Sequence, residues 1–157
     1  MTAQVLYTWH THNEINLTLI QAIPKKGFSA IPAGSNGLTV REQFVHINLV
    51  RISWLGYHTT GKRPKLPYAN DAFFTKKELI KMFTLSGKDI EEFIKASLKG
   101  KAKPIMFGRN AVKWMGYLIS HESHHRGSIM LALKQNGIKI PQKISLDGLW
   151  FKWRQSD

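Results

Sequence analysis

Two copies of one helix-initiation signal constrain the fold of this chain more than any other feature of its sequence. Thr39-Val40-Arg41-Glu42 and Thr75-Lys76-Lys77-Glu78 both match the capping box. In this motif the threonine hydroxyl accepts a hydrogen bond from a free amide, and the glutamate three positions later reaches back to the threonine amide. The first box predicts a helix over residues 40–57. The second predicts a long helix that Gly87 would bend or weaken and that stops near Gly100.

Two further segments have the spacing of apolar residues that an amphipathic helix requires. Apolar side chains recur at three- or four-residue intervals over residues 3–23, which Pro24 terminates, and over residues 110–136, which Gly137 follows. The strand-like patterns KPIMF and GIKIP are short, and neither alternates long enough to build a sheet. The sequence therefore predicts an all-α fold, a four-helix bundle that forms one domain over residues 1–157.

The connections after the first and second predicted helices are long, which bears on the order of the helices. An up-down-up-down bundle needs only short turns, whereas a long crossover connection allows two consecutive helices to run parallel. The tail, residues 138–153, contains several large aromatic side chains. We expect this tail to pack over one end of the bundle.

The amino-acid composition limits the chemistry that the chain can perform. Because there is no cysteine, a metal site must be built from His, Asp, Glu or main-chain oxygens. With 157 residues the chain can bury a core without a metal, so a bound ion would serve function. No apolar run approaches the ~20 residues that a bilayer requires, and the N-terminal residues lack a signal-peptide pattern. We expect a cytoplasmic protein with no membrane partner.

The chain is strongly basic, with a formal net charge of +13. Such a charge favours nucleic acid, anionic ligands or acidic partners through long-range attraction. Much of the excess lies in two short clusters, residues 62–65 and 95–103, and not in a stripe interleaved with aromatic residues. Solvated surface lysines are the simpler interpretation, so nucleic acid is not expected as a partner. A non-catalytic basic module that binds nucleic acid or an anionic ligand is the alternative function.

The stretch HESHHRG, residues 121–127, carries the most specific chemical signal. His121 and His125 are one helical turn apart within the apolar stripe of the fourth predicted helix, so their ring nitrogens can converge on one ion. Two partly exposed histidines near the open end of the bundle are the alternative. With Glu122 between them, the pair also matches the H-E-x-x-H motif of zinc metallopeptidases.

Three observations argue against a metallopeptidase. No His or Glu follows His125 to supply a third ligand, and Ser128 stands where the metzincin motif has glycine. Glu122 is rotated by about 100° from His121 on a helix, toward a neighbouring helix or solvent. An ion pair with Arg126, four positions later on the helix surface, is the simplest role for this glutamate.

A third ligand is therefore sought upstream, where four histidines are available: His10, His12, His46 and His58. Of these, only His46 lies in the middle of a predicted helix. Asn13 is a candidate either for a supporting contact at the site or for a hydrogen bond between helices. His124 is expected to be a neighbour of the site or a surface residue. No residue is assigned a catalytic role.

Taken together, these segments resemble the DinB/YfiT-like family of metalloenzymes over nearly the whole chain. The resemblance rests on His121-x-x-x-His125-Arg126-Gly127, on His46 within FVHINLVRISWL, on the Trp and Asn of the first helix and on the Trp-rich tail. It implies a four-helix bundle of up-down-down-up topology and a divalent metal, zinc or nickel, held by His46, His121 and His125. Ser128 departs from the glutamine that often follows H-R-G in the family, so one contact around the site is expected to differ.

The resemblance implies a metalloenzyme without naming one reaction. Some members transfer a small thiol to an electrophile, others look like hydrolases or isomerases, and a member that binds metal without turnover is a further alternative. Because this chain has no cysteine, a low-molecular-weight thiol would have to be a substrate. We therefore expect a small-molecule substrate, and the dimerisation common among relatives makes a homodimer a further expectation.

Overall fold

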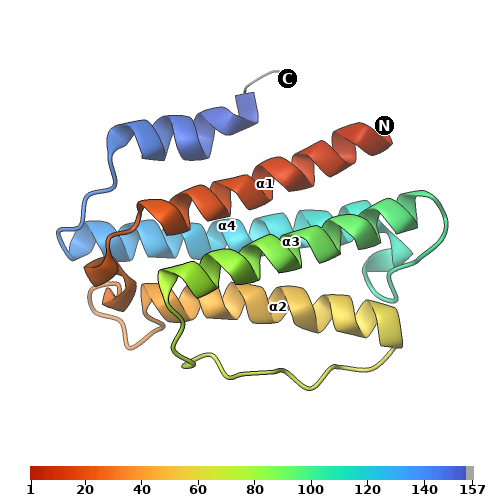
Figure 1. The fold of residues 1–157 in the computed structure, drawn as a ribbon, viewed down its shortest axis with the longest axis horizontal. Coiled ribbons are helices and arrows are strands. Elements are labelled where there is room, and N and C mark those ends of the chain that lie inside the picture. Colours follow the sequence, from red (N-terminus) through yellow and green to blue (C-terminus); the bar gives the residue numbers. More distant parts are fainter. Residues whose placement is uncertain (155–157) are drawn as a thin grey trace.

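The computed structural model describes residues 1–154, which are helical and contain no strand (Figure 1). The all-α prediction is confirmed for this part of the chain. Its long α-helices are α1 (Thr2–Ala22), α2 (Val40–Thr60), α3 (Lys76–Leu98) and α4 (Ala111–Gln135). Shorter helical elements are η1 (Lys25–Ser29), η2 (Phe107–Arg109), η3 (Ile144–Trp150) and η4 (Phe151–Arg154). None of the helices over residues 1–154 has the length and hydrophobicity needed to cross a membrane.

Both predicted capping boxes are formed at the starts of α2 and α3. The Thr39 amide donates to Glu42 Oε2 at 2.7 Å, and the Thr39 hydroxyl accepts from the Glu42 amide at 3.2 Å. Thr75 and Glu78 repeat the arrangement, with the two corresponding distances at 2.7 Å and 3.3 Å. Each box satisfies amides at the helix N-terminus that have no partner within the helix. These local signals therefore placed two helix starts correctly.

The long helices pack so that α2 contacts both α3 and α4, and α1 contacts the same two helices from the other side. Residues 61–75 form the connection between α2 and α3. In Figure 1 this connection returns along the length of the molecule before α3 begins. The return brings the connection alongside α2, the helix that carries His46.

Two apolar clusters make up the core, and a layer of polar side chains lies between them along every long helix. The Phe83 cluster includes Leu19, Phe44, Phe83 and Ile129, whereas the Trp114 cluster includes Trp9, Ile90, Trp114 and Leu118. The layer between them, here called the polar layer, consists of His12, Asn13, Asn16, Arg51, Ser86, Glu122 and Arg126. Burying so many polar groups costs free energy unless they are hydrogen-bonded, so their partners decide what the layer does.

Gly87 is a point of close approach between α1 and α3, and α3 continues through it without a break. Gly87 therefore does not interrupt the helix. Trp9 Nε1 donates to the Gly87 carbonyl at 2.8 Å, and a Cβ at position 87 would lie 2.4 Å from Asn13 Nδ2. Asn13 cannot easily move aside, because its Oδ1 accepts a hydrogen bond from Arg51 Nη1 at 2.8 Å.

We expect Gly87→Ala to destabilise the folded chain by about 1–3 kcal/mol, because the added methyl group overpacks this contact. Gly116→Ala on α4 is the matched control, since a Cβ there meets no atom within 4 Å. That substitution should stabilise by roughly 0.5–1 kcal/mol through the lower backbone entropy of alanine. Urea unfolding followed by circular dichroism measures both values. A neutral or stabilising Gly87→Ala would show that the contact is loose.

The tail differs from its prediction, because η3 and η4 lie along α1 and not over one end of the bundle (Figure 1). The chain turns back after α4 at Gly137, whose φ of 69° is in the left-handed region that glycine adopts readily. Gly148 of η3 comes so close to Thr18 of α1 that a Cβ would lie 2.9 Å from its methyl group. The tail therefore covers the outer face of α1.

Candidate metal centre

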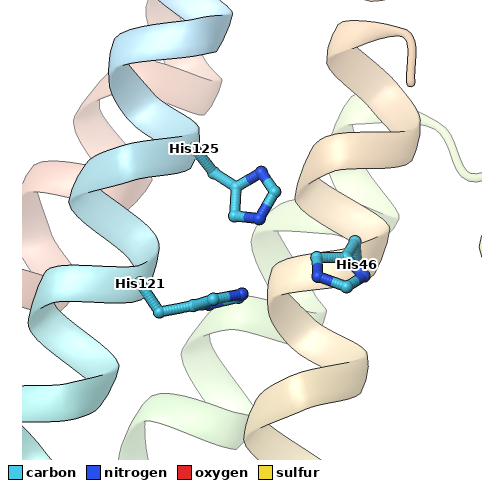
Figure 2. A group of neighbouring side chains, drawn as sticks. All are labelled: His46, His121 and His125. Atoms are coloured by element: carbon cyan, nitrogen blue, oxygen red, sulfur yellow. The ribbon is translucent and has the colours of Figure 1, made fainter. Parts of the chain in front are cut away.

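Three histidines that are far apart in the sequence converge between α2 and α4 (Figure 2). His46 projects from α2, while His121 and His125 project from successive turns of α4, and the three rings point toward one another. One donor atom from each ring lies within 4.8 Å of the other two. The ring centroids are 5.4 Å apart for His46 and His121, 4.9 Å for His46 and His125, and 4.7 Å for His121 and His125. The group is partly exposed, so solvent and small molecules can reach it.

The other histidines that the sequence analysis considered are not part of this cluster. His10 is exposed on α1, and His12 is fully buried in the polar layer. His58 is buried among aromatic rings, with Trp54 and Phe93 stacked on it. His124 is exposed and contacts only the edge of the cluster, 5.3 Å from the His125 ring. Among the upstream candidates, the fold therefore brings His46 alone to the His121–His125 pair.

The hydrogen bonds around the cluster leave ring nitrogens available to an ion. His125 Nδ1 contacts Gln43 Oε1 at 3.4 Å, which favours the tautomer with the proton on Nδ1 and a free lone pair on Nε2. His121 Nδ1 is buried and has no hydrogen-bond partner among the described residues. The Tyr117 ring is stacked on His121, with centroids 6.0 Å apart, and limits how far that imidazole can turn. Imidazole nitrogens with free lone pairs suit a divalent transition metal.

Burial and mutual repulsion favour the uncharged forms of His121 and His125. Burial, together with a smaller contribution from the nearby rings of His121 and His46, lowers the pKa of His125 to about 4. The pKa of His121 is also lowered, first by burial and then by His46. A metal binds only the unprotonated imidazole, so the site is ready to bind an ion at neutral pH without first losing protons from these two groups.

The metal-free protein should lose stability as the pH falls from about 6.5 to about 4. Histidines of unfolded chains have a pKa of about 6.5, so in this window the unfolded state takes up protons that folded His125 and His121 do not. The free energy of unfolding then falls by up to about 1.4 kcal/mol per pH unit for each such proton.

Urea unfolding of chelator-treated protein at pH 7 and pH 5 measures this loss. Between pH 7 and pH 5 the free energy of unfolding should fall less in His125→Gln than in the wild type. In the exposed His124→Gln it should fall as much as in the wild type. An equal pH dependence in all three proteins would contradict the assignment of the low pKa to His125.

Glu122 lies next to the cluster in sequence, but its carboxylate points into the polar layer and is fully buried. Arg51 Nε donates to Glu122 Oε1 at 2.8 Å, and Arg51 Nη2 donates to Oε2 at 2.7 Å. Oε2 also accepts from Asn16 Nδ2 at 2.7 Å and lies 2.8 Å from His12 Nε2. This forked pair with arginine is the strongest geometry for a carboxylate, and it joins α4 directly to α2.

The predicted surface ion pair between Glu122 and Arg126 is therefore wrong. Asn16 lies between the two side chains. Its Nδ2 donates to Glu122, and its Oδ1 accepts from Arg126 Nη1 at 2.9 Å. Arg126 also donates to Ser123 Oγ at 2.7 Å. The spacing of four residues did place both charges on one face, but that face is turned toward α1, where a side-chain amide separates them.

Glu122 is also unable to act as the general base that H-E-x-x-H would require. Burial raises the pKa of its carboxyl, but attraction from Arg51 and the hydrogen bonds from Arg51 and His12 outweigh that effect, so the net shift is downward. For His12 burial has the opposite sign: it lowers the pKa of the imidazole, more than attraction to Glu122 raises it. A neutral His12 then donates from Nε2 to a permanently ionised Glu122.

Sequence reasoning missed Arg51, His12 and Asn16 as members of this network. One signal was available, because Arg51 is a charged residue within the largely apolar helical segment LVRISWL. A charge at such a position is buried only if it is paired. Asn13, by contrast, was named as a candidate for a helix-packing bond, and it accepts from Arg51 across the α1–α2 boundary.

A cavity of about 590 Å³ opens beside the cluster and reaches it at His46. Side chains of α2, the 61–75 connection and α4 line it, among them Trp54, Tyr68 and Tyr117. A second, smaller cavity of about 140 Å³ lies at the other side of the cluster, where Gln43, His125 and Ser128 line it. Ser128, which departs from the glutamine expected at this position, thus lies beside the site, and Gln43 of α2 supplies the amide that contacts His125.

Comparison with known protein families gives one match that covers the chain. The model of the DinB family matches residues 1–157. No curated protein gave a significant match to the sequence.

Proposed function

The chain belongs to the DinB family, and from that membership together with the convergence of His46, His121 and His125 we propose that it is a divalent-metal-dependent enzyme. The three histidines are the proposed ligands, and zinc or nickel is the proposed ion. We also propose that the long helices form a four-helix bundle with up-down-down-up topology. The long return of residues 61–75 supports this order, because it allows α2 and α3 to run parallel.

The observation that carries the proposal is the approach of three donor atoms to within 4.8 Å of one another. His121 and His125 share one helix, but His46 arrives from another, 75 residues earlier in the chain than His121. Imidazoles that repel one another when protonated gain nothing from this proximity unless a cation lies between them. Burial is the main cause of the lowered pKa of His125, and repulsion from His121 and His46 lowers it further.

Three protein ligands leave at least one coordination position for a substrate, which is the property that separates catalytic from structural sites. The ion would supply Lewis-acid chemistry, lowering the pKa of a bound water or thiol or polarising a carbonyl group. We propose thiol transfer to an electrophile as the reaction, with hydrolysis as the second candidate. In thiol transfer the thiol loses its proton to solvent, the resulting thiolate sulfur forms a bond to the electrophilic carbon, and the leaving group departs with the bonding electron pair. The thiol is a substrate, since the chain has no cysteine.

The chain's own residues would orient the site and limit its access to water. Gln43 holds His125 by its Nδ1, and Tyr117 stacks on His121, so two of the three imidazoles have fixed orientations. The Arg51–Glu122 pair joins the two helices that carry the histidines at the level of the cluster. The cavity beside His46 offers a largely apolar space where a substrate can displace water.

Elemental analysis of tag-free protein tests the metal site. The wild type, offered zinc or nickel and then dialysed, should retain about one ion per chain, and His46→Ala and His125→Ala should retain almost none. The control is His124→Ala, which removes a neighbouring imidazole outside the cluster and should keep the ion. Circular dichroism must show that each variant is folded. The proposed ligand set would be wrong if the wild type retained no ion, or if His46→Ala retained as much ion as the wild type.

The same samples test the enzyme. Metal-loaded wild type should accelerate the reaction of glutathione or cysteine with 1-chloro-2,4-dinitrobenzene, followed by absorbance, or the hydrolysis of 4-nitrophenyl acetate. Acceleration should disappear with chelator and in His46→Ala. If the ion binds as expected but no thiol or ester is turned over across a broader substrate panel, the chain is a metal-binding member of the family without turnover.

A further inference from the structure

The cavity beside His46 has a composition that defines the ligand it can accept. Four large aromatic side chains belong to its wall, beside aliphatic ones: Trp54, Tyr57, Tyr68 and Tyr117. Trp54 meets the edges of Tyr57 and Tyr117 at centroid distances of 6.1 and 6.0 Å, so these rings brace one another. Its volume of about 590 Å³ lies within the range of roughly 300–1,000 Å³ found for small-molecule pockets. Such a wall favours a flat or apolar molecular body.

One charged side chain, Arg63, belongs to the lining, and no carboxylate does. Arg63 lies on the 61–75 connection, at the exposed side of the cavity, and makes no hydrogen bond or ion pair within residues 1–154. Its guanidinium is therefore free to bind an anionic group with paired hydrogen bonds. The net charge of +13 favours the approach of an anion to this side chain.

Tyr68 adds a second polar contact to the cavity. Its hydroxyl accepts from Asn48 Nδ2 at 2.6 Å, which leaves the hydroxyl proton available to a ligand. Burial raises the pKa of this phenol, so the group remains a neutral donor at physiological pH. Arg63 and Tyr68 thus offer donors to an acceptor group, while the aromatic wall offers contact to carbon.

We propose that this cavity binds a small amphipathic molecule with an aromatic or apolar body and one anionic group, held by the aromatic wall and Arg63 respectively. The proposal rests on the proposed function, since the end of the cavity at His46 is where such a molecule would reach the ion. Arg63 then acts as a specificity-determining residue. It selects anionic ligands over neutral molecules of the same shape.

A pair of fluorescent probes with the same aromatic body tests this inference. 8-Anilino-1-naphthalenesulfonate carries a sulfonate that N-phenyl-1-naphthylamine lacks, and both become brighter in apolar surroundings. Titrations of metal-free and zinc-loaded wild type should show tighter binding of the sulfonate. Arg63→Gln should lower the affinity for the sulfonate probe by about fivefold, as expected for the loss of one partly exposed ionic contact. The affinity for the neutral probe should stay unchanged.

Two further variants make the result specific to the cavity. Lys65→Gln removes an exposed charge from the same connection without altering the lining, so it should leave both affinities unchanged. Ser53→Phe places a ring in the cavity and should strongly lower the affinity for both probes. Equal weakening in Arg63→Gln and Lys65→Gln, or unchanged binding in folded Ser53→Phe, would overturn the proposal. Arg63 is exposed, so its variant should fold even if Ser53→Phe does not.

Metal content, measured on the same samples, separates the two hypotheses. If the ion is retained but the probes do not distinguish wild type from Arg63→Gln, the ligand proposal falls and the metal site stands. If the probes behave as expected but no ion is retained by any sample, the proposed function falls, and the cavity remains an anion-selective site without a metal.

Discussion

Replacing Arg51 with methionine is expected to destabilise the folded chain by about 3–5 kcal/mol, because it leaves the buried carboxylate of Glu122 without its main partner. Arg51 and Glu122 are both fully buried, and the guanidinium forms two of the four hydrogen bonds that the carboxylate accepts. Arg51 also donates to Asn13 and Ser86. The loss therefore reaches α1 and α3 as well as α4.

Urea unfolding of the variant beside the wild type measures this effect. Arg63→Met is the matched control, since Arg63 is exposed and unpaired over residues 1–154, and its change should stay within about 0.5 kcal/mol. The double variant Arg51→Met/Glu122→Leu should recover part of the loss, because both charges are then replaced by apolar groups of similar size. Losses that simply add in the double variant would show that the two side chains do not act as a pair.

Binding of the ion should have an effect of similar size on stability. At a free metal concentration about a thousand times the dissociation constant, the folded state gains about 4 kcal/mol. For a chain of this length that corresponds to a rise in melting temperature of roughly 8–16 °C. Thermal unfolding with added zinc or nickel, and again after chelator, measures this gain. His46→Ala should melt at one temperature under both conditions.

The control for the metal-induced rise in melting temperature is His124→Ala, which should show the same rise as the wild type. If the melting temperature of His46→Ala rose as much as that of the wild type, the ion would be bound at another site, and the three-histidine site would be wrong. Because each of these variants changes one imidazole, the comparison also separates the loss of a ligand from a general effect of removing histidine. Together these unfolding measurements compare stabilisation by an ion with stabilisation by the buried pair beside it.

The histidine cluster was predictable from sequence only with help from family resemblance. Spacing alone placed His121 and His125 on one helical face, but His46 was one of four upstream candidates. The structure brings His46 to the pair and leaves His10, His12 and His58 elsewhere. The assignment of these residues as ligands remains a prediction until the ion is measured.

The sequence by itself determined where the long helices begin, approximately where they end, and which class of fold they form. The signals for a helix are local: a capping box joins residues three positions apart, and proline and glycine act at their own positions. Tertiary structure decided what each helix face meets. Glu122 turned out to face Arg51, Asn16 to separate it from Arg126, and the tail to lie along α1. These outcomes depend on the rotation and register of one helix against another, and a periodic sequence pattern marks the inward face of a helix without naming its partner.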